Sequence, residues 1–341
     1  MKYVGPLPMH DPLYNYLCRC IMPQIGADGR CGFRVFANQS SHAVYIYEDR
    51  ATGLRVVGKY FRDGESDFEQ AKRKMYREYN NLKEFRRYLG NCHYVAQALG
   101  CNENLNCLLV TEYCTGEALD TIITGAIYQH DSSRLFQKLS ALGNFLATIH
   151  NSSALPVMVD FQKICRYFDM ISNQLRYLAG SRKVEHLQHL CNFYRNSFKM
   201  YQDQEVLVHG DATPANFFFG DGMYVITFDL ERMQRTDRLF DTGRIAGEIK
   251  HYFLYHTGNK YASEPFIGHF IWEYCGKGMI PLTFSLLNGI IKKNVIIEGV
   301  VMGRMGMTLL RIARNTYLSN DYRQKLIHEA ELTLEKGTFQ S

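Results

Sequence analysis

The stretch VLVHGDATPANFFFGDGMYVITFDLE, residues 206–231, decides how this sequence is interpreted. Two runs rich in aromatic and β-branched residues, Phe217–Phe219 and Met223–Phe228, flank Asp221-Gly222, which is a strong β-hairpin signal. A histidine, an asparagine and several carboxylates surround these runs. An unpaired acid beside a buried strand is costly, so polar groups in these places indicate chemistry.

The predicted hairpin brings Asn216 close, across the ladder, to the end of the strand that carries Asp229. Asp211, on a proline-containing loop, would face the same opening. Two oxygen ligands on opposite sides of a short hairpin suit Mg²⁺, which prefers hard oxygen donors and keeps other positions for water and phosphate. A separate carboxylate could orient a hydroxyl nucleophile and accept its proton. This division of roles predicts phosphoryl transfer.

Six residues of the stretch form a recognisable series, namely His209, Gly210, Asp211, Pro214, Asn216 and Asp229. The series resembles the aminoglycoside phosphotransferase and choline kinase-like family, which has a protein-kinase-like fold. The resemblance covers roughly residues 32 to 250. It implies a two-lobed α+β fold, with a β-rich nucleotide-binding lobe in residues 1–113 and a mainly helical lobe in residues 114–341.

The resemblance also implies the role of each site residue. Asp211 would be the catalytic base, and Asn216 and Asp229 would be ligands of Mg²⁺. Lys59, in VVGKYF, would bind the phosphates of ATP or GTP. Glu78, in the following helix, would form an ion pair with Lys59 and position it.

The segment LLVTEYCTGEALD, residues 108–120, resembles the hinge of the family. Backbone groups of Glu112, Tyr113 and Cys114 would there hold the adenine.

Two parts of the sequence depart from the family pattern. Ala212-Thr213 replaces the Leu-His that the family usually has after the catalytic aspartate. The usual Ile-Asp at the end of the strand reads Ile226-Thr227-Phe228-Asp229 here, so Glu231 is the fallback for Asp229 as metal ligand. The first turn of the predicted sheet has no glycine-rich loop. Its small polar residues, with Ser40 and Ser41, could still contact phosphate, and Gly26–Gly32 is a weaker candidate.

The pattern of the remaining chain agrees with a β-rich part followed by a helical part. Residues 32–61 predict three antiparallel strands, residues 66–90 an amphipathic helix, and residues 94–100 and 105–113 two further strands. We place the lobe boundary at residues 113–116. Beyond it, residues 206–231 are the only obvious β insertion among helices, which are predicted at residues 132–151, 161–179, 183–201, 242–257 and most of 284–336.

Composition narrows the class of protein. The chain has 341 residues, 46% of them hydrophobic, and a formal net charge of +5 from scattered charges of both signs. Without a long basic run, a nucleic-acid partner is not expected. The ten cysteines have neither disulfide-framework nor zinc-ligand spacing. With no signal-peptide pattern and no uninterrupted apolar span, we expect a cytoplasmic protein without a transmembrane segment, and nothing fixes its oligomeric state.

Several polar residues have a structural interpretation that must be weighed beside the catalytic one. His209 is expected to support its loop by hydrogen bonding, and His150 to close its helix. Asp241 is expected to stabilise the loop and not to bind metal. Asp211 could instead merely cap a turn, but its spacing to Asn216 favours catalysis.

The resemblance implies a small-molecule hydroxyl as the acceptor, and the fold does not fix its identity. Residues 271–341 carry nine Lys or Arg against six Asp or Glu, which favours a neutral or anionic acceptor, such as a sugar, a glycoconjugate or an amino alcohol, over a polycationic aminoglycoside. The alternatives are a protein kinase and a catalytically silent nucleotide-binding scaffold of the same fold. Against a protein kinase, Leu230-Glu231 stands where such enzymes have Phe-Gly, and no Ala-Pro-Glu follows.

Overall fold

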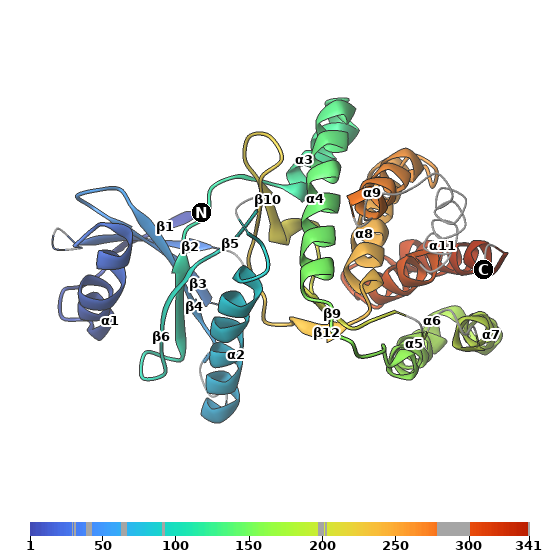
Figure 1. Cartoon of the computed structure of the whole chain (residues 1–341), viewed down its shortest axis with the longest axis horizontal. Helices are drawn as coiled ribbons and strands as arrows, with labels where there is room; N and C mark the ends of the chain where they lie inside the picture. Colours follow the sequence, from blue (N-terminus) through green and yellow to red (C-terminus); the bar gives the residue numbers. More distant parts are fainter. Residues whose placement is uncertain are drawn as a thin grey trace. The chain divides into compact units, whose positions relative to one another are not determined.

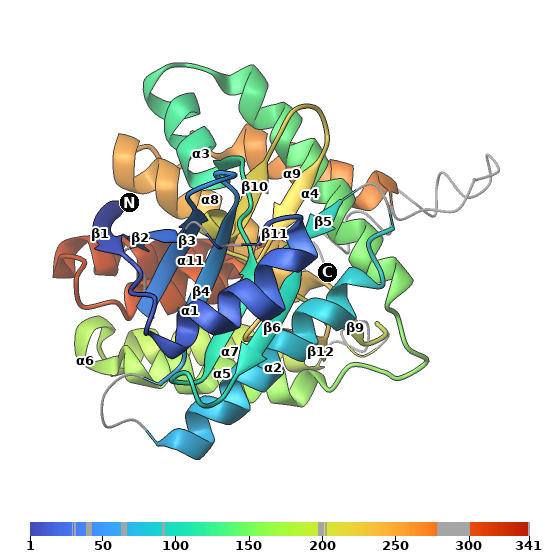
Figure 2. The same ribbon diagram turned by 90° about the vertical axis from the view of Figure 1, so that its left-hand side faces the viewer.

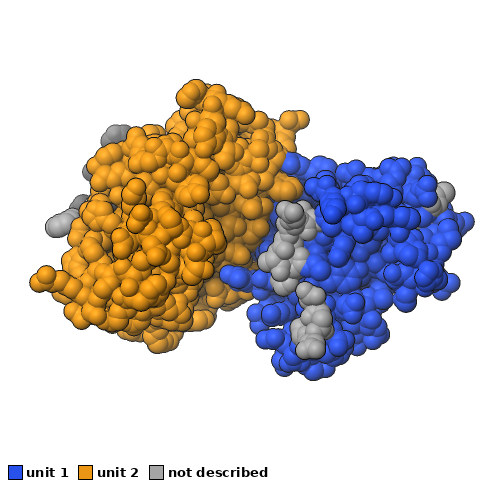
Figure 3. All heavy atoms as spheres, turned by 180° about the vertical axis from the view of Figure 1, so that it is seen from behind, with its two compact units in different colours: residues 1–116, 226–232 blue, residues 117–225, 233–341 orange. Residues whose placement is uncertain are grey.

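The computed structural model describes residues 1–28, 30, 32–38, 43–62, 67–90, 93–196, 201, 203–277 and 301–339. The chain divides into two compact units, one formed by residues 1–116 with 226–232, the other by residues 117–225 with 233–341 (Figure 3). The predicted boundary at residues 113–116 would leave residues 226–232 with the helical part. Their contacts instead group them with the first unit.

The first unit is built on a six-stranded sheet with strand order β1-β2-β3-β4-β7-β6 (Figure 1). The strands are β1 (Lys2–Pro6), β2 (Phe33–Asn38), β3 (Ala43–Asp49), β4 (Arg55–Tyr60), β6 (Ala98–Asn102) and β7 (Leu108–Glu112). Every neighbouring pair in this sheet is antiparallel. The three predicted strands are therefore β2, β3 and β4, and β1 adds an edge that the sequence did not reveal.

The first residues of the chain cover this sheet. Helix α1 (Pro12–Tyr16) begins with Pro12 at its first position, and the side chain of Asp11 accepts a hydrogen bond from the amide of Leu13. A π-helical turn (Leu17–Ile21) and a 3₁₀ turn (Met22–Ile25) follow. Their apolar side chains form one buried cluster with the sheet, which includes Leu17, Ile21, Phe33, Val56 and Val110.

Helix α2 (Phe68–Arg86) follows β4 and packs beside β6, as Figures 1 and 2 show. Its buried face carries Met75, Leu82 and Phe85 at helical spacing. The predicted strand at residues 94–100 is in fact two strands, β5 (Tyr94–Val95) and β6. β5 leaves the main sheet and pairs in parallel with Ile226–Thr227, the part of β11 (Val225–Thr227) that belongs to this unit.

The second unit is mainly helical. Its helices are α3 (Leu119–Tyr128), α4 (Ser132–Ser152), α5 (Phe161–Gln174), α6 (Arg176–Ala179), α7 (Ser181–Asn196), α8 (Leu239–Thr257), α9 (Glu264–Lys277), a helical segment at residues 301–313, and α11 (Asn320–Phe339). The predicted apolar stripe of α4 is buried, including Leu135, Leu139 and Leu142. The single helix predicted at residues 161–179 is interrupted at Leu175, between α5 and α6.

Short strands appear in this unit at more places than predicted. β10 (Phe217–Phe219) pairs with β8 (Glu117–Ala118), and β9 (Val206–Val208) pairs with β12 (Gln234–Thr236), both antiparallel. The prediction that residues 206–231 hold the only β insertion is therefore wrong. β8 and β12 have two and three residues, too short to leave an alternating pattern in the sequence.

Two glycines of α8 let the helical segment at residues 301–313 approach closely. A Cβ on Gly243 would overlap the Cβ of Arg304, and a Cβ on Gly247 would lie 2.6 Å from the Cβ of Thr308. Arg304 also forms a buried ion pair with Asp237, just before α8.

Among the described residues, no helix is long and apolar enough to span a membrane. Of the helical region predicted over most of residues 284–336, residues 284–300 lie outside the described part, and residues 301–313 and 320–336 are helical.

Candidate active site

In the first unit, Lys59 is the centre of a partly buried charge cluster. Its Nζ lies 2.8 Å from a carboxylate oxygen of Glu78 and 2.6 Å from one of Asp229. Strand β4 carries Lys59, and α2 carries Glu78 on its buried face. Because the lysine side chain is only 12% exposed, both contacts are largely shielded from water. The structure thus brings together the lysine and the glutamate that the sequence predicted as a pair.

The segment with Asp229 is fixed within this unit by two further contacts. Thr227 pairs with Val95 of β5, and Asn81 of α2 donates its side-chain N–H to the carbonyl of Leu230 at 2.7 Å. Asp229 has φ of 61°, a left-handed conformation that is uncommon outside glycine. Such backbone strain persists where surrounding contacts impose it, and it is enriched at functional sites.

The cluster contains three carboxylates and one ammonium group. Oxygens of Glu78, Asp229 and Glu231 lie within 4.8 Å of one another, and Lys59 is 3.5 Å from Glu231. Burial raises the pKa of Glu78 to about 7, although Lys59 opposes this shift. Burial by itself would lower the pKa of Lys59, but Glu78 and Asp229 outweigh it and raise the pKa. Hard carboxylate oxygens with excess negative charge fit a divalent cation such as Mg²⁺.

In the second unit, the loop from Asp211 to Asn216 closes on itself. The side-chain amide nitrogen of Asn216 donates to the backbone carbonyl of Asp211 at 2.9 Å, and its backbone N–H donates to Thr213 at 3.0 Å. Residues Pro214–Asn216 form a 3₁₀ turn that leads into β10. Because its nitrogen is the donor here, the amide oxygen of Asn216 is the atom suited to bind a metal ion.

Helix α8 fixes the same loop from two positions of its first turns. Asp241 accepts hydrogen bonds from the amides of His209 at 2.6 Å and Gly210 at 3.1 Å. Arg244, one turn later, donates to the carbonyl of Gly210 at 3.1 Å and forms an ion pair with the carboxylate of Asp211. The loop-stabilising role expected for Asp241 agrees with these bonds. Sequence reasoning missed Arg244, because its partners Gly210 and Asp211 lie 34 and 33 residues away in the sequence.

Two histidines support this arrangement. Nδ1 of His209 accepts a hydrogen bond from the amide of Asp211 at 3.3 Å. His150 lies in the last turn of α4, as predicted, and is fully buried, with Nδ1 at 2.8 Å from the hydroxyl of Tyr274 and Nε2 at 3.6 Å from Asp241. Burial opposes ionisation of Asp241, but His150 and the backbone amide of His209 lower its pKa below the usual value. Asp241 is therefore an ionised acceptor.

The predicted hinge residues lie at the end of β7, and part of their backbone is already bonded. The amide of Glu112 donates to the carbonyl of Gln97 at 2.9 Å, and its carboxylate accepts from the hydroxyl of Tyr94 at 2.6 Å. Adenine would therefore rely on other backbone groups of residues 112–114. Cys114 is half-buried, and burial raises the pKa of its thiol to about 12. Ser40 and Ser41 lie outside the described residues.

A model of the phosphotransferase enzyme family matches residues 32–257, about two thirds of the chain. The chain therefore belongs to this family. Its predicted resemblance to aminoglycoside phosphotransferases and choline kinase-like proteins is confirmed. Comparison with curated proteins gives no match.

Solved structures with the same fold are distant in sequence. An ethanolamine kinase of Plasmodium vivax is 13% identical, with a TM-score of 0.54 over 90% of this chain and 81% of that one. The GDP complex of an aminoglycoside 2'-phosphotransferase IIIa mutant is 16% identical, with a TM-score of 0.51 over 89% and 90%. A macrolide 2'-phosphotransferase of Brachybacterium faecium is 13% identical, with a TM-score of 0.50 over 93% and 98%.

These likenesses establish the α+β phosphotransferase fold, with its β-sheet part and its helical part, as predicted. The family match identifies the protein as a phosphotransferase, a kinase with an alcohol group as acceptor.

Proposed function

We propose that the protein transfers the γ-phosphate of ATP or GTP to a hydroxyl of a small molecule, with Asp211 as catalytic base. The observation that carries the proposal is the contact of Lys59 with both Glu78 and Asp229. Kinases bind the phosphates of the nucleotide with a lysine that a glutamate positions and with a metal ion that an acid holds. Lys59, Glu78 and Asp229 supply these groups.

Each residue has a distinct role in this proposal. Lys59 binds the phosphates of the nucleotide, and Glu78 positions Lys59 through their 2.8 Å ion pair. Asn216 and Asp229 hold Mg²⁺, with Glu231 as the alternative ligand. When bound, Mg²⁺ neutralises charge that develops on the phosphates during transfer. Backbone groups of residues 112–114 hold the base of the nucleotide, and Ser40 and Ser41 contact its phosphates.

Asp211 orients the acceptor hydroxyl for in-line attack and accepts its proton. The contacts of its loop support this role. Asp241 accepts from the amide of Gly210, Arg244 donates to its carbonyl, and Arg244 also pairs with the Asp211 carboxylate. A carboxylate held in this way loses little orientational freedom when substrate binds, which is the contribution that positioning makes to phosphoryl transfer.

We propose a sugar, a glycoconjugate or an amino alcohol as the acceptor. The excess of basic residues in 271–341 disfavours a polycationic aminoglycoside. The eight cysteines among the described residues are all free thiols, which supports action in a reducing compartment such as the cytoplasm.

The test is nucleotide consumption by the purified protein with Mg²⁺ and either ATP or GTP. The acceptor panel contains sugars, glycoconjugate cores, amino alcohols, aminoglycosides and a protein substrate. The key variant is Asp211→Asn, which keeps the size of the side chain and removes the base. The matched control is Asp221→Asn, in the exposed turn of the same stretch.

Turnover with one acceptor that is lost in Asp211→Asn and kept in Asp221→Asn would support the proposal and name the substrate class. Equal turnover in both variants would overturn the role of Asp211. Nucleotide binding without turnover on any acceptor would favour the silent scaffold, and phosphorylation of the protein substrate alone would favour a protein kinase. Loss of nucleotide binding in Lys59→Met is also expected.

A further inference from the structure

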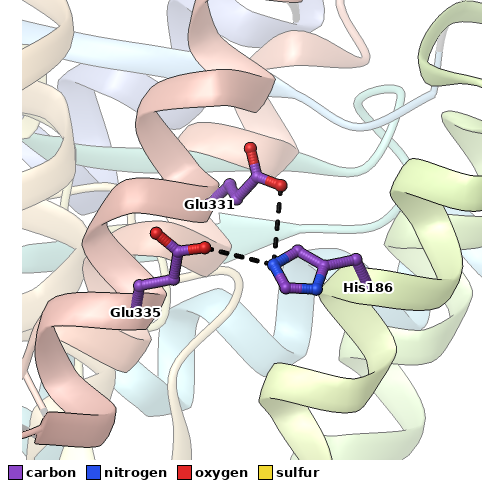
Figure 4. A group of neighbouring side chains, drawn as sticks. All are labelled: His186, Glu331 and Glu335. Carbon is purple, nitrogen blue, oxygen red and sulfur yellow. Dashed lines mark hydrogen bonds and ion pairs between the residues drawn. The ribbon is translucent and has the colours of Figure 1, made fainter.

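A second group of metal-ligating side chains lies between α7 and α11, within the second unit (Figure 4). His186 comes from α7, and Glu331 and Glu335 come from α11, one helical turn apart. Nε2 of His186 lies 3.1 Å from Oε1 of Glu335 and 3.6 Å from Oε1 of Glu331. Figure 4 shows the imidazole pointing toward both carboxylates. None of these residues has a role in the proposed phosphoryl transfer.

The spacing of the three atoms fits a single metal ion. Zinc binds histidine nitrogen and carboxylate oxygen at about 2.0–2.2 Å. In a tetrahedron with such bonds, neighbouring ligand atoms are about 3.4 Å apart. The two measured nitrogen–oxygen distances, 3.1 Å and 3.6 Å, lie on either side of this value. All three atoms are within 4.8 Å of one another, so small side-chain shifts suffice to coordinate an ion.

Two other side chains contact the carboxylate of Glu331 through Oε2 and leave Oε1, the oxygen near His186, for the metal ion. Oε2 of Glu331 lies 2.5 Å from Nζ of Lys183 and 3.4 Å from Nδ1 of His328. Such outer contacts to a ligating carboxylate are a regular feature of metal sites.

The donor set and the exposure indicate the kind of ion. One imidazole and two carboxylates, without a thiolate, suit a divalent ion of intermediate softness such as Zn²⁺. The side chains of His186 and Glu335 are 43% and 36% exposed, so water can reach a fourth coordination position. We propose that His186, Glu331 and Glu335 form a Zn²⁺ site that joins α11 to α7. The apolar side of α11, with Leu326 and Ile327, already packs in the core of this unit.

The test is Zn²⁺ titration by calorimetry of the whole protein after treatment with EDTA, with Co²⁺ absorption as a second readout. All proteins carry Asp229→Asn, so that the active-site carboxylates contribute less. We expect one ion per chain, a Co²⁺ spectrum of tetrahedral intensity, and at least tenfold weaker binding in His186→Gln and Glu335→Gln. The matched control is His189→Gln, an exposed histidine one turn further along α7, which should bind as the parent does.

Unchanged affinity and stoichiometry in both His186→Gln and Glu335→Gln would overturn the proposal and leave the group as a network of surface ion pairs. The same conclusion would follow if the parent bound no Zn²⁺. Far-UV circular dichroism of each variant checks that it folds, and the two independent variants keep the test decisive if one does not.

Discussion

Replacing Glu78 by glutamine should change how the stability of the first unit depends on pH. Burial raises the pKa of this carboxyl from 4.5 to about 7. At a pH below the pKa of Glu78 in the unfolded chain, the carboxyl is protonated in both the folded and the unfolded state. Between this pKa and the pKa in the folded protein, only the folded state holds the proton, so rising pH favours unfolding. The loss of stability is complete at a pH above the pKa in the folded protein. Stability contributed by Glu78 is therefore lost as pH rises from about 4.5 to about 7.

The magnitude follows from the size of the shift. One pKa unit corresponds to about 1.36 kcal/mol, so a shift of about 2.5 units amounts to about 3 kcal/mol. Glutamine has no proton to lose. The free energy of unfolding of Glu78→Gln minus that of the parent should therefore rise by about 3 kcal/mol between about pH 4.5 and about pH 7.5.

The difference between the two proteins is the quantity to measure. Burial lowers the pKa of His93 and His251 to about 4, and their effect on stability has the opposite slope, but it is common to both proteins. Hydrogen exchange of α2 peptides during urea unfolding reports the first unit specifically. A difference that stays constant within about 1 kcal/mol over this range would refute the reasoning, because the ion pair with Lys59 would then dominate burial.

Three further changes test the packing and the site of the second unit. Gly243→Ala should lower the free energy of unfolding by about 1–3 kcal/mol, because the new Cβ would overlap Arg304. Gly268→Ala, which has open space at its Cβ, should not, and thermal unfolding compares the two variants. Asp237→Asn should cost about 3–5 kcal/mol in urea unfolding, because Arg304 would lose its buried partner; a cost below about 1 kcal/mol would contradict this. Arg244→Lys should lower kcat about 10- to 100-fold with little change in nucleotide KM, since Nη1 and Nη2 of the guanidinium contact Gly210 and Asp211 separately and lysine has no such planar fork. Steady-state kinetics would reject the positioning role if kcat were unchanged.

Local patterns were sufficient for most of the elements. Alternating β-branched and aromatic residues predicted β2, β3 and β4, and the periodic apolar stripe predicted α4 almost to the residue. Elements of two or three residues, such as β8 and β12, were missed because two alternations are not distinguishable from loop sequence. The N-terminal strand β1 was missed because its side chains are mostly exposed and carry no apolar alternation.

The same limit applies to contacts among the site residues: those between residues close together in the sequence were predicted, and those between distant segments were not. Asp211 and Asn216 lie in one short loop, so their proximity follows from local spacing. Arg244 was missed because its partner is 33 residues away in the sequence, and an arginine on a helix is otherwise an ordinary surface residue.

The sequence by itself determined the α+β class, the order of the elements and the residue types available for phosphoryl transfer, because these depend on contacts between near neighbours. Only the tertiary structure decided which of these residues meet. Lys59 contacts Asp229 across 170 residues, and residues 226–232 group with the sheet unit although the residues before and after them in sequence belong to the helical unit. Such contacts depend on which buried surfaces pack together, and that is a property of the whole chain and not of any local pattern.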